Sequence, residues 1–90
     1  MTFLVATILV ACAVTPPVQE MSNARQTIAA AHEVRAEVFA QQHMAEAERL
    51  MSQATAALES GDYVAAKDYA VAAQKQAIKA RQQAISKQNN

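Results

Sequence analysis

Apolar residues recur at alternating intervals of three and four along most of the chain, the spacing of one face of an α-helix. The first stripe consists of Met21, Ala24, Ile28 and Ala31. The second consists of Ala47, Leu50, Met51, Ala54, Ala57 and Leu58. The third and longest consists of Tyr63, Ala66, Ala70, Ala73, Ala77, Ala80 and Ala84. The pattern therefore predicts helices over roughly 18–36, 41–59 and 62–88.

Two kinds of signal place the ends of these helices. Gly61 can take the left-handed conformation that ends a helix, and Asp62 can cap the next one. Pro17 suits the start of the first helix. Between Glu33 and Gln41 the pattern blurs without a Gly or Pro. Two alternatives stay open there: the first helix stops near 36 and a second begins near 41, or one long helix runs through.

The third stripe is almost wholly alanine, and this predicts close packing. Small side chains let helix axes approach toward the short end of the usual range of about 8–10 Å. Ninety residues with one Gly and two Pro favour a single helical domain. The expected fold is a small all-α, Ala-rich antiparallel bundle of two to three helices. A core of this composition buries little area per residue, so its stability is expected to be modest.

The N-terminal segment has the character of an export signal. Residues 2–14 carry no charge, and as a helix they would span about 20 Å of a hydrocarbon core about 30 Å thick. They are too short to cross it but suit the apolar region of an export signal. No Lys or Arg lies between Met1 and this apolar segment. The basic charge that usually precedes such a segment would come from the α-amino group, or from residues added by a start codon farther upstream.

Leu9-Val10-Ala11-Cys12 resembles the lipobox of bacterial lipoproteins. The resemblance implies that residues 1–11 are a cleaved signal peptide and that Cys12 carries palmitate and other acyl chains. Residues 12–17 would then be a lipidated tether and residues 18–90 the helical domain. Ala13 stands where an Asp would retain such a protein in the inner membrane, which implies the outer membrane, facing the periplasm. The alternative is an apolar N-terminus with an incidental cysteine.

The rest of the chain resembles small envelope lipoproteins classed as a domain of unknown function, family 4398. Two segments carry the likeness. One is Met21 to Gln26, and the other is Ala45 to Leu50 followed by Ala54, Ala57, Leu58, Gly61-Asp62-Tyr63 and Ala66. The Pro that many members have near the equivalent of Gln41 is absent. The hairpin around Gly61 also resembles one tetratricopeptide unit, and a single unit cannot bury its own face. The resemblance implies work in the cell envelope and gives no functional residues to transfer.

Charge is balanced overall but uneven along the chain. A net charge of zero offers no global attraction to nucleic acid. No acid follows Gln74, and the cations beyond it, here called the distal cations, are Lys75, Lys79, Arg81 and Lys87. The dipole of the last helix favours cations near its C-terminus, so a solvated face explains them. The functional alternative is contact with lipopolysaccharide, lipid head groups or peptidoglycan.

Tyr63 and Tyr69 are the other candidate contact residues. They are expected in the core, or in a hydrophobic groove between the last two helices. His32 and His43 are eleven apart, whereas a metal pair on one helix prefers three or four, and both are predicted to be exposed or at helix ends. No catalytic constellation, metal site or cofactor site is predicted, and an enzyme is not expected.

Three functions stay open. The first is a structural or interaction module that is anchored to the membrane through lipid on Cys12 and contacts an envelope protein or peptidoglycan. The second is a periplasmic carrier of lipid or another hydrophobic ligand. The third is a homo-oligomer that assembles through the alanine stripe, although the turn at Gly61 argues against one uninterrupted coil.

Overall fold

The computed structural model describes residues 15–89, which form four α-helices and no strand. The helices are α1 (Val18–Glu33), α2 (Ala36–Phe39), α3 (Gln41–Glu59) and α4 (Tyr63–Gln88). The predicted small all-α bundle is confirmed. Each of the three apolar stripes lies on one long helix, and α2 is a single additional turn that the pattern did not predict. Within residues 15–89, every helix is too short or too polar to span a bilayer.

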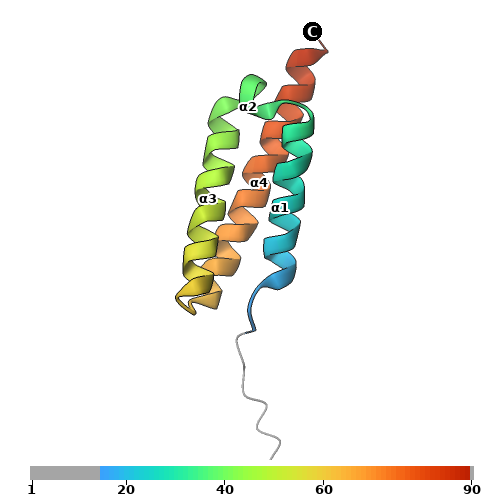
Figure 1. The fold of residues 1–90 in the computed structure, drawn as a ribbon. Helices are drawn as coiled ribbons and strands as arrows, with labels where there is room; N and C mark the ends of the chain where they lie inside the picture. The colour runs from blue at the N-terminus through green and yellow to red at the C-terminus, as the bar shows by residue number, and fades with distance from the viewer. Residues whose placement is uncertain (1–14, 90) are drawn as a thin grey trace, which may run out of the picture.

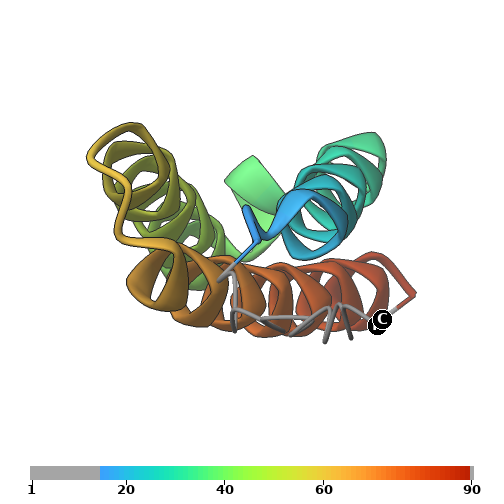
Figure 2. The ribbon, with the colours of Figure 1, turned by 90° about the horizontal axis from the view of Figure 1, so that it is seen from below.

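Helix α4 is the packing surface shared by the other helices. Both α1 and α3 pack on the same side of α4, as seen along the bundle, and contact each other far less than they contact α4 (Figure 2). Helix α3 runs antiparallel to α1 and α4 (Figure 1). None of the described helices covers the opposite side of α4.

The bundle has two distinct ends. Thr15 to Pro17 enter the bundle at the end where α1 and α4 begin and α3 finishes, here called the proximal end (Figure 1). Helix α2, the start of α3 and the end of α4 lie at the other end, the distal end. At about 1.5 Å per residue, the 26 residues of α4 separate the two ends by about 39 Å.

The alanine stripe of α4 forms the floor of the core. Its six alanines have no exposed surface. The proximal part of the core consists of Met21, Ala24, Ala54, Ala70 and Ala73. The distal part consists of Ala31, Ala36, Ala40, Met44, Ala80 and Ala84. Met21 and Met44 are the largest fully buried side chains, so most of the interior is made of methyl groups that permit close helix contact.

The chain is interrupted between α1 and α3, as in the first of the two alternatives above. Helix α1 ends at Glu33, short of the predicted 36, and Arg35 adopts the left-handed conformation with φ +58° and ψ +41°. This conformation costs a residue with a Cβ about 1–2 kcal/mol. The guanidinium of Arg35 lies 5.8 Å from the centre of the Phe39 ring. The interruption turns the chain so that Ala36 and Ala40 join the distal core.

The turn between α3 and α4 forms as the sequence predicts. Gly61 has φ +81°. The Gly61 N–H donates to the Leu58 carbonyl and the Asp62 N–H to the Ala57 carbonyl, the two bonds of a Schellman motif. The Asp62 side chain accepts a hydrogen bond from the Ala65 N–H at 3.1 Å and so caps α4. The chain therefore reverses within three residues, and α4 returns alongside α3.

Enlarging one alanine of the stripe is expected to destabilise the bundle. Ala73 is fully buried in the part of the core shared by α1, α3 and α4, so leucine there pushes the helices apart. Ala73→Leu is expected to lower the free energy of unfolding by about 1–3 kcal/mol in urea titrations. Ala45→Leu, at an exposed position of α3, serves as the control and is expected to change it by less than about 0.5 kcal/mol. Equal stability of the two variants would contradict the close-packed stripe.

Candidate functional site

The distal cations are spread around α4. Lys75 and Lys79 are exposed and, at about 100° of rotation per residue, lie roughly opposite the buried stripe of α4. Arg81 lines an open hollow of about 390 Å³ between α1 and α4. Lys87 lines a hollow between α4 and the region of α2 and the start of α3. All four side chains are exposed, so they surround the distal half of α4 and do not form a patch on one face.

The charge of α4 changes along its length. Its first half carries Lys67 and Asp68, and the half beyond Gln74 carries four cations and no acid. Taking about 1.5 Å per residue from Tyr63, the distal cations lie between about 18 and about 36 Å from the proximal end of the helix. The positive charge is therefore displaced from the end at which the N-terminal segment enters.

The two tyrosines lie on opposite sides of the alanine stripe. Tyr63 is half-buried and lines a hollow with Pro16, Pro17 and the first turns of α4. Tyr69 lies between α3 and α4 with 36% of its surface exposed. Six residues on a helix correspond to a rotation of about 240°, so Tyr63 and Tyr69 cannot face the same groove. The expected single groove lined by both is wrong, and only Tyr69 lies in the α3–α4 groove.

His32 and His43 lie on different helices, and His32 is exposed whereas His43 is half-buried. His32 is in the last turn of α1. His43 is in the first turn of α3, and its Nδ1 lies 2.8 Å from the Gln76 Oε1 atom of α4. Among residues 15–89 no group of three or more His, Cys, Asp or Glu side chains is placed to hold a metal ion.

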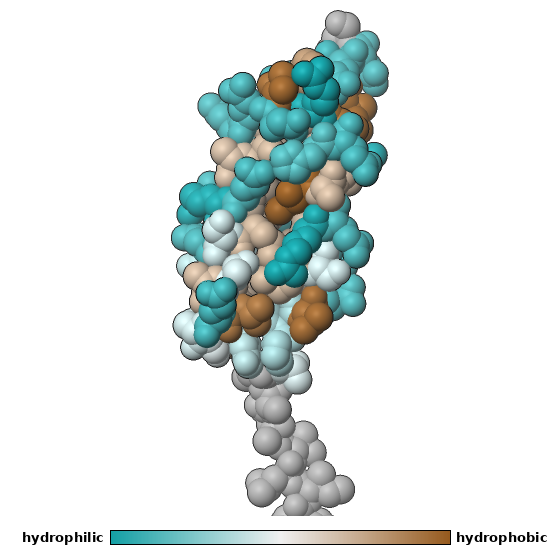
Figure 3. Space-filling view, viewed as in Figure 1, coloured by the Kyte–Doolittle hydropathy of each residue, from teal (hydrophilic) through white to brown (hydrophobic). Residues whose placement is uncertain are grey.

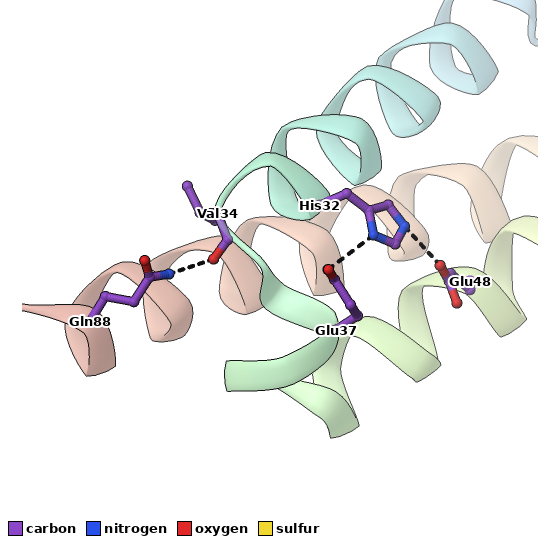
Figure 4. A network of polar contacts seen from close by, with 5 residues as sticks. All are labelled: His32, Val34, Glu37, Glu48 and Gln88. Carbon is purple, nitrogen blue, oxygen red and sulfur yellow. Dashed lines mark hydrogen bonds and ion pairs between the residues drawn. The ribbon is translucent and has the colours of Figure 1, made fainter.

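His32 connects three helices near the distal end, a contact that the sequence did not reveal. Its Nδ1 lies 3.1 Å from a carboxylate oxygen of Glu37 in α2, and its Nε2 lies 3.0 Å from one of Glu48 in α3 (Figure 4). A neutral imidazole carries one N–H, so both contacts have donors only when the ring is protonated. The Gln88 amide donates to the Val34 carbonyl beside this network (Figure 4). These contacts hold the region around the interruption to α3 and α4.

The surface offers open hollows and few apolar areas. Four hollows on the described part of the surface are open to solvent, and each is lined in part by residues of α4. Polar side chains cover most of the face that α1 and α3 present, and apolar side chains gather in small separate patches on it (Figure 3). Within residues 15–89 no polar or charged side chain is buried. The most distinct chemistry of this surface is the positive charge of distal α4.

Cys12 and the segment that resembles a lipobox lie outside the described residues. No protein-family model, curated protein or solved structure matches the chain.

The His32 contacts lead to a pH dependence of stability. Hydrogen bonds from the backbone and from His32 lower the pKa of Glu37 from its ordinary value of 4.5. A carboxyl whose pKa is lowered on folding stabilises the fold above its unfolded pKa and loses that contribution as pH falls through its folded pKa. Between about pH 5 and about pH 3, urea unfolding is therefore expected to show a steeper loss of stability for the wild type than for Glu37→Gln.

Glu59→Gln, at the proximal end of α3, controls for the removal of one surface carboxylate. Its stability is expected to fall with pH as steeply as that of the wild type. If Glu37→Gln also follows the wild type throughout this range, Glu37 contributes nothing through its contacts.

Proposed function

We propose that this chain is an envelope lipoprotein, anchored in the outer membrane by acyl chains on Cys12, that acts as a structural or interaction module. Its distal cations hold an anionic partner at a distance from the membrane. One observation carries the proposal: the chain enters the bundle at the end where α4 begins, whereas the distal cations lie along the second half of α4.

The anchor determines which anionic partner the cations can reach. The six Cα–Cα steps from Cys12 to Val18 span about 20 Å even when fully extended, so a lipidated Cys12 keeps the proximal end close to its bilayer. Lys87 then lies about 36 Å farther along α4. A bundle standing on its anchor therefore directs the distal cations toward the periplasm, and favours the carboxylates of peptidoglycan or of an acidic protein over nearby lipid head groups.

The sequence supplies independent support. The Leu9 to Cys12 segment resembles a lipobox, and the helical region resembles lipoproteins of family 4398. The bundle also fits an interaction module better than the two other functions. Assembly through the alanine stripe, or its opening around an acyl chain, would require α1 or α3 to leave α4, because their contacts bury the stripe completely.

Lipidation is tested at Cys12 itself. Cells given an alkyne analogue of palmitate are expected to label the wild-type chain and to leave Cys12→Ser unlabelled, because only a thiol forms the thioether that carries the diacylglyceryl group. Labelling is read by gel fluorescence after coupling to a dye. Ser86→Ala, which leaves the N-terminal segment intact, is expected to label like the wild type. Equal labelling of Cys12→Ser and wild type would contradict the anchor.

Partner contact is tested by reversing charge at the distal end. Cross-linking in intact cells, followed by mass spectrometry, is expected to recover an envelope partner with the wild type. The double variant Lys79→Glu and Arg81→Glu is expected to reduce that yield several-fold, because both side chains are exposed.

Arg25→Glu with Lys67→Glu is the matched control. It makes the same charge change at exposed positions in the proximal half of the bundle. Its yield is expected to stay near that of the wild type. Equal yields from all three chains would contradict a distal contact surface, and so would the absence of any partner above background.

A further inference from the structure

The proximal end carries the two most exposed large apolar side chains in the described part of the chain. Val18, the first residue of α1, is 71% exposed, and Val64, the second residue of α4, is 61% exposed. Beside them, Pro16, Pro17 and Tyr63 line an open hollow of about 440 Å³. Neither valine belongs to the core clusters of the bundle. Both valines therefore present apolar surface to solvent at the end where the chain enters the bundle.

We infer that this proximal surface, formed by Val18, Tyr63 and Val64, rests on the lipid interface in which Cys12 is anchored. The inference depends on the proposed anchor. It adds that the folded domain itself contacts the bilayer and does not swing freely on its tether.

The length of chain between the anchor and the bundle identifies the bilayer as the occupant. Five residues separate Cys12 from Val18, and even their full extension leaves the proximal end within about 20 Å of the anchor. Pro16 and Pro17 restrict the tether further, because the proline ring fixes φ. An acylated Cys12 therefore holds both exposed valines within reach of the interface.

Charge at this end makes the contact depend on apolar burial. The acids Glu59, Asp62 and Asp68 are exposed there, against Lys67, which lies 3.9 Å from Glu20. Anionic head groups would be repelled by this balance, so zwitterionic lipid is the appropriate surface. Aliphatic side chains that enter the interface are stabilised there because their apolar surface is removed from water. Burial of both valines therefore favours the orientation in which the proximal end faces the membrane.

The absence of tryptophan permits a direct test. Val18→Trp and Val64→Trp each introduce one fluorophore at the proximal end. Val38→Trp introduces one at the distal end, where Val38 is 47% exposed in α2. Each chain is expressed in full, purified from membranes and checked by mass spectrometry for acylated Cys12. A chain found without acyl groups is coupled through the Cys12 thiol to a maleimide lipid, so that every variant is anchored at the same residue.

The anchored chains are placed in phosphatidylcholine vesicles with or without bromine on the acyl chains, which quenches tryptophan on contact. Brominated lipid is expected to reduce the emission of Val18→Trp or Val64→Trp, and to leave that of Val38→Trp unchanged. Unchanged emission of both proximal variants would overturn the inference, because the domain would then stand clear of the bilayer. Equal quenching of all three would overturn it too, because the bundle would lie flat. The mass of Cys12 reports separately on the proposed lipidation.

Discussion

The absence of side chains larger than a methyl group along one face of α4 is the constraint on which the rest of the fold depends. Six consecutive stripe positions are fully buried alanines, and they let α1 and α3 approach the same side of α4 closely. Few bulky apolar residues are then needed, and two methionines fill the largest fully buried positions. A small chain with little apolar bulk can therefore form an ordered bundle, at the expense of a core that tolerates little enlargement.

This one-sided packing also decides what the surface can do. Because α1 and α3 share one side of α4 (Figure 2), no described helix covers the opposite side. The exposed Lys75 and Lys79 lie on that side by helical rotation from the buried stripe. The turn at Gly61 places the start of α4 beside the entry of the chain, and its end at the far end of the bundle. A proximal end with exposed valines and a distal half of α4 that carries cations and no acid thus follow from the same helix arrangement. The proposed anchor would give these two ends different environments.

The features predicted correctly from sequence are those fixed by local spacing. The alanine stripe, the left-handed Gly61 and the Asp62 cap each depend on residues within a few positions of one another. The sequence does not decide whether the helix is interrupted at Arg35, because no Gly or Pro marks the position. Distant contacts, such as that of Gln88 with Val34, maintain the conformation there. The contact of His32 with Glu48 spans sixteen residues, and it could not be foreseen without knowing where α1 ends. The separation of Tyr63 from Tyr69 was predictable from helical rotation, and the prediction of one groove overlooked it.

Amide hydrogen exchange of the Cys12→Ser chain tests most directly whether α4 organises the bundle. If both α1 and α3 depend on the alanine stripe, amides from Ala66 to Ala84 exchange only through global unfolding. Helix α1 contacts mainly one partner helix, so its amides are expected to exchange through local opening at a lower free energy. Slowest exchange confined to α4 and the facing turns of α3 is the predicted result. Exchange within α4 as fast as that at the ends of α1 would contradict the account.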